Sequence, residues 1–244
     1  MNLPDYIVIG ETKCGTTSLY NYLIKHPQIL DTFGNGEGYD DTYKTKELRF
    51  FDKFYERGID WYKSLFPKAK PGCITGEATP MYMYRSLVAK RIAEHIPNVK
   101  LVVVLRDPVD RFISQFYHNF KWVPGFSERY PNIKVYLNSM IDPDYYILEK
   151  GMYYYSLIKW MELFNKEQFY VFSSEEMFSE PQSTYNKLVN FLGLEAYKVD
   201  EFNKYRSNDY PDVDPEIIKE LTEFYRLANQ KLFTLVGREF NWRK

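Results

Sequence analysis

The stretch PDYIVIGETKCGTTSLYNYL, residues 4–23, decides the fold. YIVIG, residues 6–10, is a continuous apolar run typical of a buried strand, and TTSLYNYLIKH, residues 16–26, has the apolar spacing of a helix. A strand that turns at glycine into a helix presents backbone N–H groups and the positive end of the helix dipole, which together attract an anion. The stretch therefore predicts a phosphate-binding loop. The alternative is an N-capped strand-to-helix turn that binds no ligand.

The loop differs from an ordinary P-loop in the place of its lysine. The P-loop pattern is G-x-x-x-x-G-K-[ST], and Gly10 and Gly15 have the interval of its two glycines. Thr16 stands where the lysine of that pattern belongs, whereas Lys13 lies inside the loop. This displacement disfavours a nucleotide kinase, which also needs a carboxylate for Mg²⁺ that only Glu77 or Asp107 could supply after a strand.

The composition is that of an ordinary globular protein. Of the 244 residues, 45% are hydrophobic and 27% charged, which is enough for one large domain with a buried core. Lys and Arg number 32 against 33 Asp and Glu, so we expect neither nucleic acid nor membrane as a partner. The longest apolar run, residues 101–105, is too short to span a bilayer, and the N-terminus lacks the regions of a signal peptide. We expect a cytoplasmic or otherwise soluble protein.

Strand and helix patterns alternate along the chain. VKLVVVLRD, residues 99–107, is the clearest strand, and DPVDRFISQFYHNF, residues 107–120, follows as a helix. CITGE, residues 73–77, and FYVFSSEEM, residues 169–177, indicate further strands. Since β-branched runs alternating with helices are typical of parallel sheets, we predict one α/β domain over residues 1–244, with a central parallel β-sheet flanked by helices. Functional residues are expected at the carboxyl ends of its strands.

A second candidate anion site follows the clearest strand. Arg106 ends that strand, and Ser114 lies eight residues further on in the next helix, on the same face as His118. An arginine can hold a phosphate through two hydrogen bonds, and a serine hydroxyl can complete the shell. The alternative is an arginine paired with Asp107 or Asp110 and a serine bonded to its own backbone.

Four segments in order resemble the sulfotransferases that use PAPS (3′-phosphoadenosine 5′-phosphosulfate). Residues 4–29 are similar to their 5′-phosphosulfate-binding loop, and LRDPVDRFISQFY, residues 105–117, to their 3′-phosphate-binding strand and helix. KTKELRFFDKFYERGIDWYKSLFP, residues 44–67, and YPDVDPEIIKELTEFYRLANQKLFTLVGREFNW, residues 210–242, resemble two further segments of the heparan-sulfate-type branch, which includes N- and 3-O-sulfotransferases. The resemblance covers nearly the whole chain and implies a P-loop-like sulfotransferase fold.

The resemblance implies roles in binding the donor, without a metal. Lys13 matches the lysine that stabilises the negative charge growing on the bridging oxygen as the phosphate leaves. Arg106 and Ser114 match the ligands of the 3′-phosphate, a group that ATP lacks. The implied ligands of the 5′-phosphate are consecutive residues of the loop: Cys14, Gly15, Thr16, Thr17 and Ser18.

The resemblance also implies residues that act near the acceptor and the C-terminal loop. Glu47, in KELRFF, matches the glutamate that takes the proton of the acceptor hydroxyl or amine. The alternative is a solvated surface charge with Lys44, Lys46 or Arg49 as its neighbour. His118 stands where the N-sulfating branch carries a functional histidine. The usual K-G-R phosphate contact is altered in this chain, and Lys204, Arg206 and Ser207 are its approximate substitutes.

We therefore expect an enzyme that moves the sulfuryl group of PAPS to a hydroxyl or amine acceptor, most simply a carbohydrate, and releases PAP (adenosine 3′,5′-bisphosphate). Two alternatives remain. One is a P-loop nucleotide kinase that depends on Mg·ATP. The other is a sulfotransferase-like module that binds PAPS or PAP without turnover.

Overall fold

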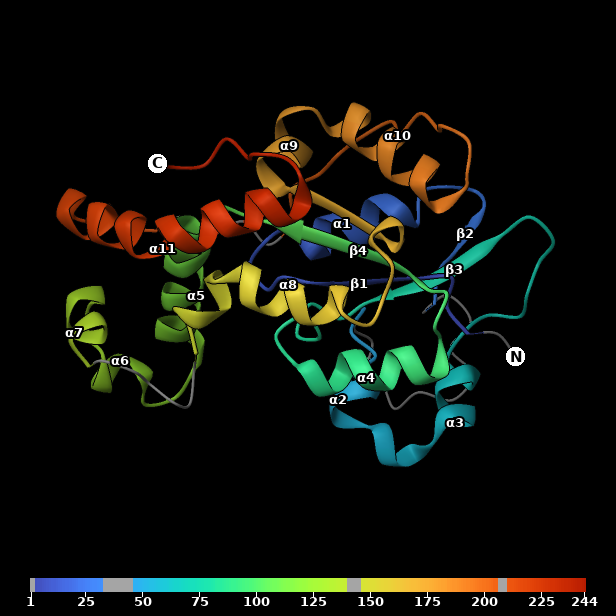
Figure 1. The fold of residues 1–244 in the computed structure, drawn as a ribbon, viewed down its shortest axis with the longest axis horizontal. Coiled ribbons are helices and arrows are strands. Elements are labelled where there is room, and N and C mark those ends of the chain that lie inside the picture. The colour runs from blue at the N-terminus through green and yellow to red at the C-terminus, as the bar shows by residue number, and fades with distance from the viewer. Residues whose placement is uncertain (1–2, 33–45, 140–145, 206–209) are drawn as a thin grey trace. The chain divides into compact units, whose positions relative to one another are not determined.

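A five-stranded sheet in which every neighbouring pair is parallel forms the centre of the fold (Figure 1). The computed structural model describes residues 3–32, 46–139, 146–205 and 210–244. The strand order is β2-β3-β1-β4-β5. The strands are β1 (Tyr6–Gly10), β2 (Ile29–Leu30), β3 (Ile74–Ala78), β4 (Lys100–Leu105) and β5 (Phe169–Ser173). The predicted α/β class with a central parallel sheet is confirmed.

The chain divides into two compact units. Unit 1 comprises Met1–Leu105 and Lys159–Arg206 and contains the sheet, whereas unit 2 comprises Arg106–Ile158 and Ser207–Lys244 and is helical. The single domain predicted over residues 1–244 stays a prediction.

Helices make up most of the remaining described structure. Unit 1 contains α1 (Thr16–Leu23), α2 (Phe50–Lys53), η2 (Tyr55–Arg57), α3 (Ile59–Ser64), α4 (Ser86–His95), η4 (Lys166–Gln168), α9 (Ser174–Ser179) and α10 (Pro181–Leu192). Unit 2 contains α5 (Pro108–Trp122), α6 (Phe126–Arg129), α7 (Ile133–Asn138), η3 (Glu149–Gly151) and α11 (Pro215–Val236). The range of α8 (Tyr153–Met161) begins in unit 2 and ends in unit 1. None of the described helices is both long and apolar enough to cross a membrane.

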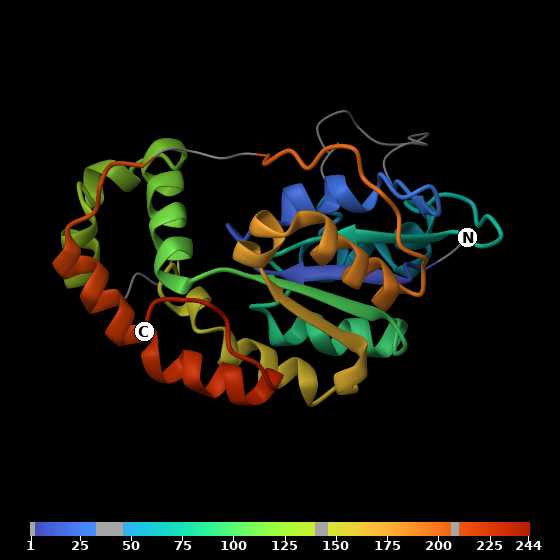
Figure 2. The same ribbon diagram turned by 90° about the horizontal axis from the view of Figure 1, so that it is seen from above.

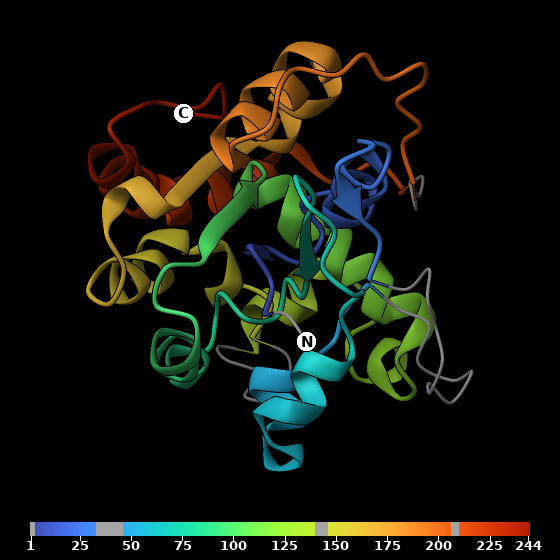
Figure 3. The same cartoon turned by 90° about the vertical axis from the view of Figure 1, so that its right-hand side faces the viewer.

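Helices cover both faces of the sheet. α1 and α10 lie on one face, and α4 lies on the opposite face (Figures 1 and 3). On the first face, Val8 of β1 and Val102 of β4 pack with apolar residues of α1 and α10 in one buried cluster. Because the central strands are buried on both sides, they have continuous apolar sequences, and this explains why the run at 99–107 was the clearest strand signal.

The strand predicted over residues 169–177 is too long at its end. β5 stops at Ser173, and α9 begins at Ser174. The Ser173 hydroxyl accepts a hydrogen bond from the Glu176 N–H, and the Glu176 carboxylate accepts one from the Ser173 N–H. This reciprocal capping box starts the helix, and its signature S-x-x-E is visible in SSEE.

Unit 2 is held together by an aromatic-rich core. Figure 2 shows α5 in green and α11 in red. Phe112 and Phe116 of α5 share one buried cluster with Leu221 and Tyr225 of α11. α5 begins with Asp107 as its N-cap, since the Asp107 carboxylate accepts a hydrogen bond from the Val109 N–H at 2.9 Å. The helix predicted after the clearest strand is therefore confirmed.

A close approach between β1 and β3 gives the first testable prediction. Tyr6 is the register partner of Gly76, and a Cβ at Gly76 would lie 2.5 Å from both the Tyr6 carbonyl oxygen and its ring. Since the backbone of β1 cannot yield, Gly76→Ala should lower the free energy of unfolding by about 3 kcal/mol, measured by urea denaturation. Gly125→Ala is the matched control. A Cβ at Gly125 would have no atom within 4 Å. The residue has a φ of +77°, so an alanine there should cost only about 1 kcal/mol for its left-handed backbone. Equal losses in the two variants would contradict the close approach.

Candidate active site

The loop between β1 and α1 is fixed to the sheet and to α9. The Glu11 N–H donates to the Val104 carbonyl of β4 at 2.8 Å, and the Cys14 N–H turns back to the Glu11 carbonyl at 3.2 Å. Lys13 and Gly15 have positive φ angles of 68° and 87°. A Cβ at Gly15 would lie 2.9 Å from the terminal methyl of Met177. The second glycine of the loop is therefore favoured by its left-handed backbone, and its α carbon packs closely against Met177 of α9.

The first turn of α1 presents backbone N–H groups that could bind an anion. The first bond back along this helix runs from the Leu19 N–H to the Gly15 carbonyl, and the N–H groups of the preceding turn have no partner within the helix. Thr17 is half-buried, whereas Thr16 and Ser18 are buried. The predicted loop ligands thus form one turn of backbone and hydroxyl groups at the carboxyl end of β1.

Two of the predicted loop ligands already make bonds within unit 1. The Ser18 hydroxyl is fully buried and accepts a hydrogen bond from the Tyr205 N–H at 3.0 Å. The Cys14 thiol is also buried and lies 3.7 Å from the Thr12 carbonyl oxygen. Ser18 therefore anchors the segment that precedes residue 206 to α1.

That segment brings Lys204 to the loop. The Tyr22 hydroxyl donates to the Asn203 carbonyl at 2.8 Å, which lays the segment along α1. The Lys204 ammonium lies 5.0 Å from the centre of the Phe178 ring, and the edge of the same ring would lie 3.2 Å from a Cβ at Gly15. Lys204 thus lies near the loop, and its role as a phosphate ligand stays a prediction. Arg206 and Ser207 lie outside the described residues.

Glu47 is joined to the loop by Lys46, which the sequence indicated only as one possible charged neighbour of Glu47. The Lys46 ammonium lies 3.2 Å from Glu47 Oε1 and 3.3 Å from Thr16 Oγ1. It also lies 3.4 Å from the carbonyl oxygen of Ala78, the last residue of β3. The structure therefore brings the candidate base and the donor loop together in unit 1. The only signal in the sequence was that Lys46 directly precedes Glu47.

A buried carboxylate, Glu77, is the hub of a hydrogen-bond network beside Glu47. Glu77 Oε1 accepts hydrogen bonds from the hydroxyls of Tyr62 at 2.5 Å and Tyr82 at 3.3 Å, and Oε2 accepts one from Thr79 at 2.6 Å. The Leu48 backbone also bonds to this carboxylate. These donors surround both oxygens, so Glu77 is not available to bind Mg²⁺, as the kinase alternative would require.

The same network fixes the backbone that follows Glu47. The Thr79 hydroxyl accepts from the Arg49 N–H at 3.4 Å, and the Tyr82 hydroxyl accepts from the Phe51 N–H at 3.3 Å. Glu47 is therefore held by a rigid segment at the carboxyl end of β3. From the sequence, Glu77 was expected only as a possible metal ligand, because no local pattern shows which groups surround a buried carboxylate.

Arg106, Ser114 and His118 belong to unit 2. The Arg106 carbonyl accepts from the Tyr153 hydroxyl at 2.8 Å. The buried Ser114 hydroxyl bonds to the Tyr210 hydroxyl at 2.8 Å, and His118 follows one turn later on α5.

The expected alternative partners of Arg106 are occupied by another residue. The Arg243 guanidinium pairs with Asp107 at 3.0 Å and with Asp110 at 2.8 Å. The pairing of Arg106 with either carboxylate stays a prediction, as does its role as a phosphate ligand.

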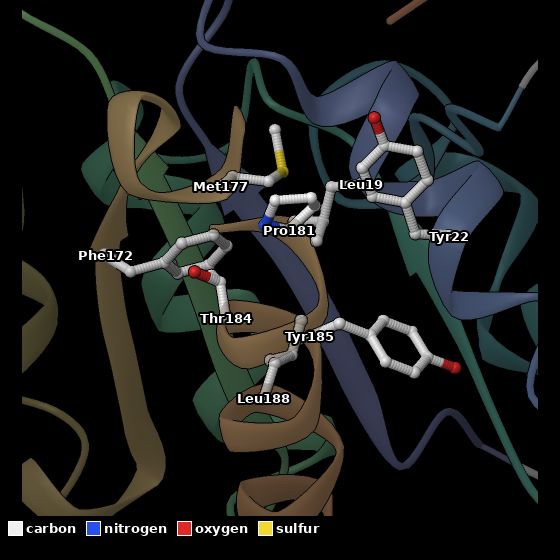
Figure 4. A pocket seen from close by; sticks show the side chains of 8 residues that line it. All are labelled: Leu19, Tyr22, Phe172, Met177, Pro181, Thr184, Tyr185 and Leu188. Carbon is white, nitrogen blue, oxygen red and sulfur yellow. The ribbon is translucent and has the colours of Figure 1, made fainter. Parts of the chain in front are cut away.

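An apolar cavity in unit 1 is too small to be a substrate site (Figure 4). Its volume is about 10 Å³, which is at the lower limit for one water molecule. It lies within the core between α1, β5, α9 and α10, and its lining residues are Leu19, Tyr22, Phe172, Met177, Pro181, Thr184, Tyr185 and Leu188. Over the described ranges, no group of three or more His, Cys, Asp or Glu residues could hold a metal ion.

Comparison with known proteins gives a consistent result. A sequence model of the family described as "Sulfotransferase domain" matches residues 3–230. Heparan sulfate glucosamine 3-O-sulfotransferase 3B1 of Homo sapiens is 29% identical over 267 residues, covering 98% of this chain and 65% of that protein. Membrane-associated sulfotransferase kil1 of Dictyostelium discoideum is 25% identical, covering 98% and 66%. The chain thus spans less than two thirds of the length of these relatives.

Solved structures share the fold. A sulfotransferase from Alicyclobacillus acidocaldarius superposes with a TM-score of 0.75 at 24% identity, and the match covers 98% of each chain. The sulfotransferase domain from the curacin biosynthetic pathway superposes with a TM-score of 0.60 at 13% identity, covering 98% of this chain and all of that domain. At these identities the likeness supports the fold alone.

The Glu77 network gives a prediction about stability and pH. Burial raises the pKa of the Glu77 carboxyl from 4.5 to about 7, although the hydrogen bonds from Thr79, Tyr62, Tyr82 and Leu48 lower it in part. Between these pH values the folded protein retains a proton that the unfolded chain has lost, so this group makes stability fall as pH rises.

Glu77→Gln remains neutral and should remove that contribution. The free energy of unfolding at pH 8 minus that at pH 5 should therefore be about 3 kcal/mol more positive in the variant than in the unaltered chain, measured by urea denaturation at both pH values. Glu56→Gln, on the exposed part of η2, is the control and should leave the difference unchanged. If the free energy of unfolding of Glu77→Gln depends on pH as that of the unaltered chain does, the pKa of Glu77 is not raised.

Proposed function

Because the chain belongs to the sulfotransferase domain family, we propose that it transfers the sulfuryl group of PAPS to a hydroxyl or amine of a carbohydrate acceptor and releases PAP. One observation carries the proposal. The candidate base Glu47 and the candidate phosphate ligand Thr16 are bound to the same ammonium group, that of Lys46. A carboxylate next to an anion-binding turn is the arrangement that proton abstraction beside a bound sulfate donor requires.

The donor loop fits a nucleotide phosphate. The N–H groups of the first turn of α1 and the Thr16 and Thr17 hydroxyls would hold the 5′-phosphate, and Lys204, beside the loop, would add positive charge. Arg106 and Ser114 would bind the 3′-phosphate. Because ADP lacks this phosphate, these two residues would make the site selective for PAP.

PAPS supplies the sulfuryl group of the reaction. Glu47 would take the proton that the acceptor loses as its oxygen or nitrogen bonds to sulfur. Lys13 would stabilise the charge left on the phosphate oxygen when its bond to sulfur breaks. His118 stays a candidate for a second catalytic group. A carbohydrate acceptor is supported by relatives named heparan sulfate glucosamine 3-O-sulfotransferases.

The first prediction from this proposal concerns the donor. PAP at about 100 times its dissociation constant should stabilise the chain by about 2.7 kcal/mol, which raises the unfolding midpoint by about 5 to 10 °C. ADP and Mg·ATP should shift the midpoint little. A shift with Mg·ATP alone would identify a kinase instead.

Arg106→Ala should lower PAP affinity at least tenfold, because it removes a ligand of the 3′-phosphate. Arg226→Ala is the control and should leave PAP affinity unchanged, since Arg226 is an exposed residue of α11 paired with Glu223.

The second prediction concerns Lys13. With [³⁵S]PAPS, and with heparan sulfate and its N-desulfated form as acceptors, Lys13→Ala should lower kcat by about 100-fold or more. Its PAP affinity should change less than threefold, because the backbone N–H groups of the loop remain. Lys198→Ala, an exposed lysine of the same unit, serves as the control. Equal small losses in kcat and affinity would remove Lys13 from the reaction. PAP binding by the unaltered chain without transfer to either acceptor would favour the binding module.

A further inference from the structure

Lys46 is bound to three segments of unit 1 at once. Its ammonium reaches the first residue of α1 through Thr16 Oγ1, the candidate base through Glu47 Oε1, and the end of β3 through the Ala78 carbonyl. Its backbone is fixed as well, because the Lys46 carbonyl accepts from the Ala78 N–H at 3.2 Å. The three oxygens match the three donors of an ammonium group, so the side chain has one defined position.

We expect the Lys46–Glu47 ion pair to contribute little to the stability of the fold. The Lys46 side chain is only 10% exposed, and withdrawing an ammonium from water costs free energy. Its partner Glu47 is 29% exposed, and partly exposed ion pairs contribute about 0–1 kcal/mol. The ion pair therefore stabilises the fold by no more than the burial of the Lys46 ammonium costs. Its place between the donor loop and Glu47 points to the reaction instead.

The hydrogen-bond directions define what Lys46 does to each neighbour. Lys46 donates to Thr16 Oγ1, so the Thr16 O–H is left to donate elsewhere, as a ligand of an anion must. Lys46 also donates to Glu47 Oε1, which fixes the carboxylate on the side of the loop. One ammonium thus orients a group on the donor side and a group on the acceptor side.

We propose that Lys46 is a positioning residue of the transfer reaction, which holds the Glu47 carboxylate in register with the donor loop. This inference rests on the proposed function, and in particular on Glu47 as the base. A general base contributes about 10²- to 10⁴-fold to rate, and a displacement of about 1 Å can cost about 100-fold. Loss of Lys46 should therefore lower kcat without removing the donor site.

The test compares Lys46→Met, which keeps the length of the side chain but removes its charge, with Lys46→Arg. Transfer from [³⁵S]PAPS to heparan sulfate and its N-desulfated form gives kcat and the KM for PAPS. Lys46→Met should lower kcat by about 10- to 100-fold and raise the KM for PAPS less than threefold. Lys46→Arg should recover at least a third of the lost kcat. Lys63→Met, which removes a lysine paired with Asp60 on α3, is the control and should change neither constant.

A double variant separates positioning from a merely structural role. In the Glu47→Gln background, Lys46→Met should lower kcat less than threefold further, because the carboxylate that it positions is gone. A full second loss in that background, or an unchanged kcat in Lys46→Met alone, overturns the role of Lys46 and leaves the proposed function standing. PAP binding by the unaltered chain without any transfer overturns the proposed function and this inference together.

Discussion

The buried carboxylate of Glu77 is the constraint on which the acceptor side of the site depends. Four donors converge on it, from Tyr62, Thr79, Tyr82 and the Leu48 backbone. Burying such a group without these bonds would cost several kcal/mol, so the network fixes the segment after Glu47 as a condition of folding. The candidate base is positioned by the same interactions that make the buried charge tolerable.

The donor side depends on backbone geometry more than on side chains. The left-handed turn at Gly15 starts α1 at the carboxyl end of β1, where the first-turn N–H groups have no partner within the helix. Ser18 and Cys14 are buried and bonded inside unit 1, so their contribution is first to the shape of the loop. Lys46 then links this loop to Glu47, so the candidate phosphate ligand Thr16 and the candidate base belong to one hydrogen-bonded structure.

Most of the fold could be predicted from the sequence, because the signals were local. The apolar runs of β1 and β4 and the glycines of the loop gave the parallel sheet and the strand-to-helix turn. The end of β5 was predicted wrongly, because the capping box between Ser173 and Glu176 starts α9 inside the predicted strand. The positions of Lys46 and Glu77 were not predicted, because both depend on segments distant along the chain.

The sequence by itself determined the sulfotransferase family, the α/β class and the residue types at the donor loop, all of which depend on order and spacing along the chain. Only the tertiary structure decided that Thr16, Glu47 and Ala78 share one ammonium group, and that Glu77 is surrounded by hydroxyls instead of solvent. The physical reason is that a hydrogen bond acts over about 3 Å in space, and no pattern along the chain records which distant groups folding brings that close.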